Sequence, residues 1–182
     1  MVRGRSLALP GAGGFEEGVL EARELYSLPV LVCGLVAILF AGWLARDVLA
    51  RDTGTPAMQD ISNRIYVGAV AFLKRQYSTI ALLSVIIAVV IGVIVGVSEK
   101  DHQTTRAVIT AGAFLFGALL SGIAGYTGMY VAVKSNIRTA SAARRSLGEA
   151  LTVALRGGAV SGFLVVALGL LGVLVMYWFV YP

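Results

Sequence analysis

The chain has 182 residues, of which 58% are hydrophobic and 22 are glycine, and its net charge is +5 at pH 7. This length suits one compact domain, but the apolar share is too high for a soluble one. In a soluble protein the positive charge would suggest nucleic acid, whereas here membrane orientation explains it, so no nucleic-acid partner is expected. The single cysteine, Cys33, excludes an internal disulfide.

Four long runs without any charged residue dominate the sequence. All 15 Lys and Arg residues and all 10 Asp and Glu residues lie outside Leu25 to Ala45, Gln76 to Ser98, Ala107 to Val133 and Gly157 to Pro182. A charge at the centre of a spanning helix costs about 2.5 to 3.5 kcal/mol, and each run is long enough to cross a bilayer. The runs therefore predict an all-α membrane protein in which four transmembrane helices, surrounded by lipid, run antiparallel in an up-down arrangement.

The predicted spans cover residues 28–45, 77–97, 108–133 and 157–180, and together they form one four-helix transmembrane unit over residues 28–182. Residues 1–27 are expected to be a disordered tail. The apolar stretch near its start is interrupted by proline and glycine, which makes it too short for the core of a signal peptide.

The helix of the second span is expected to begin well before the membrane. Thr55 and Pro56 form a good helix start, because a side-chain oxygen that can cap the helix precedes a residue with a preset φ. An apolar stripe at spacings of three and four follows, consisting of Met58, Ile61, Ile65, Gly68, Phe72 and Leu73. No helix breaker separates the stripe from the span, so one helix from Pro56 to about Val97 is predicted, roughly 60 Å long.

The third helix is expected to overshoot the membrane in the same way, through Lys134, Arg138 and Arg144. Ser146 followed by Glu149 is a candidate capping box that starts the fourth helix. Two helices would then carry long cytoplasmic extensions. The alternative for these extensions is an amphipathic segment that lies flat on anionic lipid.

Loop charges set the predicted orientation. Most of the 15 Lys and Arg residues lie in segments 46–76 and 134–156, and the positive-inside rule places both segments in the cytoplasm. With four spans, both termini then lie outside, and the protein is a multi-pass protein of the cell membrane.

Small residues indicate helix-packing faces. In the third span Gly117, Ser121 and Gly125 recur every four residues, and Gly158 and Gly162 begin a second small face in the fourth helix. Small side chains let another helix backbone approach closely. Ordinary close packing is the preferred interpretation of all five positions.

No established catalytic motif occurs in the chain, since phosphate-loop, metalloprotease, paired-cysteine and nucleophile-elbow patterns are all missing. Asp47, Asp52 and Asp60 alternate with arginines in one loop, which is typical of a solvated charged surface. The sequence therefore nominates no catalytic, metal-binding or substrate-binding residue.

Four arginines gather at the predicted cytoplasmic end of the third and fourth helices: Arg138, Arg144, Arg145 and Arg156. One interpretation is an electrostatic rim that attracts an anionic substrate toward a site formed elsewhere. The preferred interpretation makes them topology determinants and contacts for lipid phosphates. Arg138 and Asn136 are also expected to tie the helix extension to a neighbouring loop by hydrogen bonds.

Three local patterns resemble one protein family. They read MQDISNRIYVGAVAFLKRQY at 58–77, GALLSGIAGYTGMYVAVKSNIRTASAA at 117–143 and ALRGGAVSGFLVVALGLLG at 154–172. In this order and spacing they resemble the amino-terminal part of the ion-translocating membrane-bound inorganic pyrophosphatases. The resemblance extends from Thr53 onward.

The resemblance implies a homodimeric pump that hydrolyses cytoplasmic pyrophosphate and moves protons or sodium ions outward, with Mg²⁺ as cofactor and K⁺ as a further candidate. It also implies that these four helices belong to an outer ring, while the remaining helices of the full-length pump bind pyrophosphate and Mg²⁺ and form the ion gate. The chain alone is expected to be catalytically incomplete, because its few cytoplasmic-side acids cannot form the carboxylate cluster that magnesium pyrophosphate requires.

The alternative is a self-contained four-helix membrane protein that acts as a binding or assembly subunit without catalysis. A proteolipid rotor subunit is disfavoured because no carboxylate lies at mid-span. Acidic helices following Pro182 would favour the pump over the self-contained subunit.

Overall fold

The computed structural model describes residues 12–98 and 103–180, and within these ranges it contains helices and no strand. The helices are α1 (Ala12–Leu49), α2 (Pro56–Ser98), α3 (Gln103–Ala143) and α4 (Leu147–Val180). All four are long and apolar enough to cross a membrane. The prediction of an all-α protein with four helices able to span a bilayer is confirmed.

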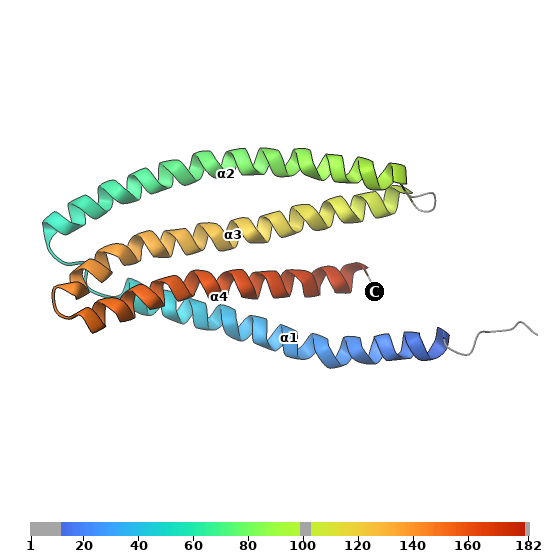
Figure 1. The fold of residues 1–182 in the computed structure, drawn as a ribbon, viewed down its shortest axis with the longest axis horizontal. Coiled ribbons are helices and arrows are strands. Elements are labelled where there is room, and N and C mark those ends of the chain that lie inside the picture. The colour runs from blue at the N-terminus through green and yellow to red at the C-terminus, as the bar shows by residue number, and fades with distance from the viewer. Residues whose placement is uncertain (1–11, 99–102, 181–182) are drawn as a thin grey trace, which may run out of the picture.

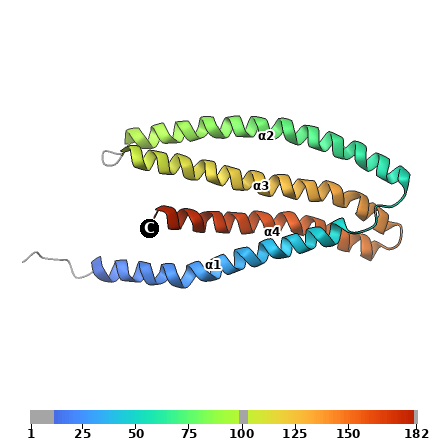
Figure 2. The same ribbon diagram turned by 180° about the vertical axis from the view of Figure 1, so that it is seen from behind.

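The four helices lie side by side in an elongated bundle (Figures 1 and 2). At one end α1 leads into α2 and α3 into α4, while α2 ends and α3 begins at the other. α3 packs against both α2 and α4, α4 also packs against α1, and α1 makes a smaller contact with α3. Among the described residues α2 contacts only α3, so most of its surface is open.

α1 begins at Ala12, upstream of residue 28 where the first span was predicted to start. Residues 12–27, expected as part of a disordered tail, are therefore helical, and residues 1–11 lie outside the described part of the chain. Glutamate, leucine, alanine and arginine dominate 16–25, and these residue types favour helix. Pro29 lies inside α1.

The caps predicted for α2 and α4 are present. The Met58 amide donates to Thr55 Oγ1 at 3.4 Å, and the Glu149 amide donates to Ser146 Oγ at 3.1 Å. The reciprocal half of the capping box does not form, because the Ser146 amide donates to a carbonyl of α3 and the Glu149 side chain binds Arg145. Both helix starts are thus confirmed, with one hydrogen bond rather than two at α4.

α2 and α3 are unbroken over 43 and 41 residues. At 1.5 Å per residue each is roughly 60 Å long, about twice the hydrocarbon thickness of a bilayer. The prediction of one continuous helix from Pro56 to the end of the second apolar run is confirmed. Each helix is therefore much longer than a span requires.

The apolar stripe predicted on the first half of α2 faces mostly away from the bundle. Ile61 and Phe72 are 59% and 58% exposed, whereas Leu73 is 5% exposed and lies against α3. Tyr66, off the predicted stripe, also faces α3, where its ring meets that of Tyr130 edge to face at 6.1 Å. The stripe exists, but α3 covers the adjoining face of the helix.

The core between α1, α3 and α4 is a narrow seam. α4 buries Ala150, Val153, Gly157, Val160, Ala167, Gly172 and Leu174. From Ala150 to Val160 the spacings alternate between three and four, and Ala167 follows after seven. Such a 3.5-residue repeat is typical of helices that cross at a small angle, with side chains of one fitting between those of the other. The seam contains two clusters of buried residues: Leu44, Val131 and Val160; and Val48, Ala142, Ala150 and Val153.

Candidate functional site

Charged side chains converge where α1 ends and α4 begins, and Arg138 of α3 is the innermost of them. Its Nε and Nη2 donate to the Leu49 carbonyl at 3.2 and 2.7 Å, and its Nη1 donates to the Lys134 carbonyl at 2.6 Å. The last carbonyls of a helix have no partner inside the helix, and a cation there also interacts favourably with the helix dipole. Arg138 therefore caps α1. The predicted tie of this residue is present, but it joins the last residue of a helix rather than a loop, and Asn136 is exposed.

Asp52, in the connection between α1 and α2, joins that connection to α3. Ser141 Oγ donates to Asp52 Oδ2 at 2.6 Å, and the Gly54 amide donates to Oδ1 at 3.1 Å. Arg145 Nη1 lies 3.3 Å from Oδ2. These contacts, the bond from Ser141 foremost, hold the pKa of Asp52 below its ordinary value because they favour the ionised carboxylate.

Arg145, between α3 and α4, also binds the first turn of α4. Its Nε and Nη2 donate to the two carboxylate oxygens of Glu149 at 2.9 and 2.6 Å. This two-pronged pairing, chiefly through its hydrogen bonds, raises the pKa of Arg145 above its ordinary value. Arg145 thus connects the start of α4 to the α1–α2 connection through Asp52.

Arg156 connects α4 to α1. Its Nη1 lies 2.7 Å from Asp47 Oδ2, and its guanidinium is 5.9 Å from the centre of the Trp43 ring. Arg51 binds the same Asp47 oxygen at 3.1 Å. Asp47 is therefore shared by two arginines, one from the α1–α2 connection and one from α4.

The fourth predicted rim residue, Arg144, is exposed, and its side chain contacts Met58 Sδ at 4.0 Å. The structure thus brings Arg138, Arg145 and Arg156 together as ties between helices, which we name the arginine clamp. The carboxylate partners of Arg156 and Arg145, Asp47 and Asp52, were not predicted, because they lie 109 and 93 residues away along the chain.

The acids near the clamp do not fit a magnesium site. Within residues 12–98 and 103–180 no group of three or more His, Cys, Asp or Glu side chains is placed to hold a metal ion. Asp47, Asp52 and Glu149 are each paired with an arginine, and adjacent guanidinium groups repel a divalent cation that needs several free oxygens. Asp60 is paired with Arg64 at 3.1 Å.

One of the five predicted packing positions lies against another helix. A Cβ added at Gly125 would lie 2.5 Å from the Tyr77 hydroxyl of α2. The other four are exposed: Gly117, Ser121, Gly158 and Gly162. Their small side chains leave open surface in this bundle.

The close approach of α3 and α4 depends on glycines that the sequence reading did not select. A Cβ at Gly157 would lie 2.7 Å from Ser135 Oγ, and a Cβ at Gly128 would overlap Ser161. Gly158, by contrast, has no atom within 4 Å of its added Cβ. The sequence carries no signal that separates the two adjacent glycines, because apolar or small residues at spacings of three and four lead to both: Ala150 and Val153 to Gly157, and Leu151 and Ala154 to Gly158.

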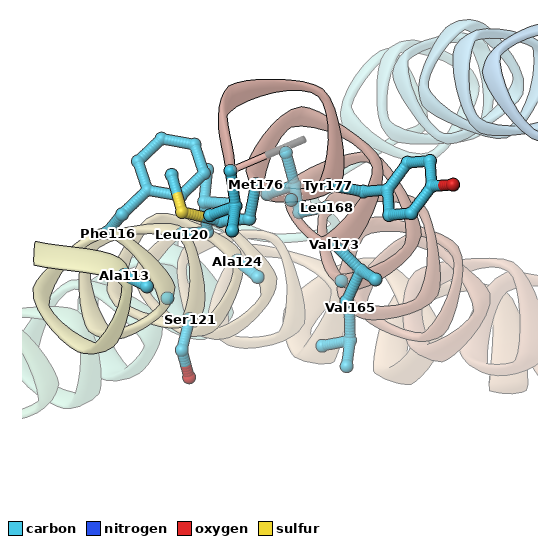
Figure 3. Close-up of a pocket in the computed structure, with 14 residues that line it drawn as sticks. Ala113, Phe116, Leu120, Ser121, Ala124, Val165, Leu168, Val173, Met176 and Tyr177 are labelled. Atoms are coloured by element: carbon cyan, nitrogen blue, oxygen red, sulfur yellow. The ribbon is translucent and has the colours of Figure 1, made fainter. Parts of the chain in front are cut away.

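Two apolar grooves run along α3. The α3–α4 groove has a volume of about 650 Å³, and Gly117 and Gly169 contribute open backbone to it. Figure 3 shows Phe116, Leu120 and Met176 close together between the two helices, while the Ser121 hydroxyl points away from α4.

The α2–α3 groove is larger, about 920 Å³. Its α2 wall is formed by Val70, Leu73, Lys74, Tyr77, Ile80, Ala81, Ser84 and Val85. Its α3 wall is formed by Leu115, Ala118, Leu119, Ser121, Gly122, Ile123, Tyr126 and Thr127. Neither groove brings together acids and bases in the way a hydrolytic site requires.

Four long apolar helices with an arginine clamp at one end define a multi-pass helical membrane protein. The family model of the inorganic H⁺ pyrophosphatases matches residues 35–182, and the chain belongs to this family. The resemblance expected from the three local patterns is confirmed.

The chain is similar to several curated proton pumps. It is 48% identical over 145 residues to the K⁺-insensitive pyrophosphate-energized proton pump 2 of Moorella thermoacetica, which covers 80% of this chain and 20% of that protein. It is 41% identical over 156 residues to the pyrophosphate-energized membrane proton pump 3 of Arabidopsis thaliana, with 81% and 20% covered. A K⁺-insensitive pump of Methanosarcina mazei is 42% identical over 155 residues, with 85% and 22% covered. The chain therefore spans about a fifth of the length of these relatives.

Proposed function

We propose that this chain forms the amino-terminal outer helices of a pump that couples hydrolysis of cytoplasmic pyrophosphate to outward proton transport. The observation that carries the proposal is the 48% identity with a pyrophosphate-energized proton pump over 80% of this chain. The proton is favoured over the sodium ion because the relatives are named as proton pumps. A self-contained binding or assembly subunit remains the competing function.

Within such a pump the four helices act as a scaffold. The three arginines of the clamp are directed at carbonyls and carboxylates of the same chain, and the acids near them do not fit Mg²⁺. Pyrophosphate and Mg²⁺ would then be bound by the remaining helices of the full-length pump, which works as a homodimer. Since two of the relatives are named K⁺-insensitive, we propose that activity does not need K⁺.

The clamp end is proposed to face the cytoplasm, with both termini outside and segments 46–76 and 134–156 inside. The density of basic residues in these two segments supports this orientation. The halves of α2 and α3 nearest the clamp then form the cytoplasmic extensions. Arg144, the member of the predicted rim that forms no ion pair within the described residues, is placed to meet lipid phosphate or a passing anion, and the other three hold helices together.

Single-cysteine labelling tests the orientation. In a Cys33→Ser background, a cysteine at Ser146 should react with a membrane-impermeant maleimide in inside-out vesicles and be protected in right-side-out vesicles. A cysteine at Thr104, at the opposite end of the bundle, should show the reverse. Labelling of Ser146→Cys from the outside of intact cells would contradict the proposed orientation.

The function is tested in liposomes with the full-length protein that contains this chain. Supplying magnesium pyrophosphate should release phosphate and acidify the vesicle lumen, and adding K⁺ should change neither rate. The 182-residue chain, reconstituted in parallel, should release no more phosphate than empty liposomes. Phosphate release without acidification by the full-length protein would refute the pump, and turnover by the 182-residue chain would refute its catalytic incompleteness.

A further inference from the structure

No described helix covers the outer side of the α2–α3 groove. Among the described residues α2 touches no helix other than α3. From Val70 to Val85 the groove follows α2 for about 22 Å at 1.5 Å per residue. Half the hydrocarbon thickness of a bilayer is about 15 Å, so the groove extends through one leaflet and reaches its headgroup region.

The polar groups of the groove are concentrated at its clamp-side end. Lys74, Tyr77, Tyr126 and Thr127 lie there, whereas the rest of the lining is apolar or small, with Ser84 and Ser121 as its other hydroxyl-bearing residues. The rings of Tyr77 and Tyr126 meet edge to face at 6.3 Å. Tyrosines of this kind are enriched at the membrane–water interface, and the span predicted from the sequence begins at residue 77, next to Lys74.

Lys74 lacks a partner of opposite charge in the described part of the chain, where the ion pairs join other residues. Its side chain is exposed and borders the groove. A cation at the mouth of an apolar slot that enters one leaflet is complementary to an anionic phospholipid. The phosphate would lie at the ammonium, and the acyl chain would lie below it.

We propose that the α2–α3 groove binds an anionic phospholipid, with one acyl chain between α2 and α3 and the phosphate against Lys74. A wholly apolar transmembrane helix in the same place would leave the Lys74 ammonium without a partner of opposite charge, whereas a lipid phosphate supplies one. An anionic phospholipid supplies both an acyl chain for the apolar slot and a phosphate for the Lys74 ammonium. The proposal depends on the membrane position of these helices and stands apart from pyrophosphate hydrolysis.

Site-specific photo-crosslinking identifies the occupant. Leu119 lines the groove and is 60% exposed, so a benzophenone amino acid at this position faces whatever fills the groove. The intact protein is placed in phosphatidylcholine nanodiscs with or without phosphatidylglycerol, irradiated and analysed by intact-mass spectrometry. We expect a phosphatidylglycerol adduct in preference to a phosphatidylcholine adduct.

Matched cation variants test the role of Lys74. Lys74→Gln should lower the preference for phosphatidylglycerol roughly fivefold, because a basic residue near an anionic membrane surface contributes about 1 kcal/mol. Lys74→Arg should keep the preference, and Arg75→Gln, the adjacent cation outside the groove, should change it little. Each variant is first checked for normal helical content and elution volume.

Several outcomes would overturn the proposal. A crosslink from position 119 to another peptide would show that a helix occupies the groove. Equal labelling of both lipids, or a preference that survives Lys74→Gln, would show that no anionic headgroup is recognised there.

Discussion

The guanidinium of Arg138 on α3 closes the C-terminal end of α1, since two of its nitrogens donate to the single carbonyl oxygen of Leu49. A lysine cannot reproduce this arrangement, because its ammonium is a point charge without a planar fork. The contact joins two helices separated by 89 positions in sequence, and it lies beside the buried cluster of Val48 and Ala142.

Removing this contact should lower stability more than substrate affinity. Hydrogen bonds to charged groups typically contribute about 1.5 to 3 kcal/mol, so Arg138→Ala should reduce the free energy of unfolding by an amount of this order. Arg138→Lys should restore only part of it. Thermal unfolding of the intact protein in detergent measures the change, and Arg144→Ala, which removes an exposed arginine of the same segment, is the control. An unchanged Tm together with a raised KM for pyrophosphate would instead indicate a role in substrate attraction.

The adjacent glycines at the start of the fourth span should respond in opposite directions to alanine. Gly157→Ala places a Cβ 2.7 Å from Ser135 Oγ, so α3 and α4 must move apart, and overpacking of this kind costs about 1 to 3 kcal/mol. Gly158→Ala meets no atom within 4 Å and gains helix propensity. We expect a lower Tm for the first variant and an equal or higher Tm for the second.

If both alanine variants lost stability equally, the close approach of α3 to α4 at Gly157 would be wrong. A double variant, Gly157→Ala with Ser135→Gly, tests the cause of the loss and is compared with Gly157→Ala alone. Recovery of Tm in the double variant would identify the Ser135 contact as the cause of the loss.

Asp52 should make stability depend on acid pH. Its pKa is lowered from an ordinary value of 3.8 in the folded protein, so its ionised contacts stabilise the fold at pH values above 3.8 and are lost as the pH falls through the lowered pKa. Asp52→Asn should therefore lower Tm by a constant amount near neutral pH. The difference between the two proteins should shrink below about pH 4.

Comparing the two proteins at each pH removes the acid sensitivity of every other group from the measurement. Asp60→Asn is the matched control, since Asp60 pairs with Arg64 on an exposed surface. A difference between wild type and Asp52→Asn that does not vary with pH would rule out a contribution from the charge of Asp52.

Gly54 should be sensitive to any side chain. Its φ of 74° lies in the left-handed region, and the position of its missing Cβ is 2.8 Å from Met58 Sδ. Gly54→Ala should cost about 1 to 2 kcal/mol, while Gly54→Asn should cost less because asparagine visits this region more readily. Thermal unfolding of the two variants measures the difference, and equal losses would assign the cost to Met58 rather than to the backbone.

The helix starts at Pro56 and Leu147 were predictable because their signals are local. Thr55 and Ser146 each cap the helix that follows within three residues. The predicted start of the first helix, residue 28, is too late, because it was based on the charge-free run. The helix-favouring residues before that run extend α1 back to Ala12.

Which side of each helix is buried could not be predicted in the same way. A span that is apolar on every face has little hydrophobic periodicity, so Gly157 and Gly158 look alike in sequence. The pairing of Arg156 with Asp47 was also inaccessible, since 109 positions separate them and only the packing of α4 on α1 brings them together. Sequence patterns therefore determined the class and the elements, while the partners of the arginines required the three-dimensional arrangement.

The uninterrupted course of α2 from Pro56 to Ser98 has a mechanical consequence. No proline lies within its interior, so the helix has none of the kinks that proline introduces. When a helix of this length tilts as a unit, its end near Met58 is displaced in proportion to the distance from the point about which it tilts. An unbroken helix roughly 60 Å long therefore converts a small tilt into a larger displacement at the clamp end.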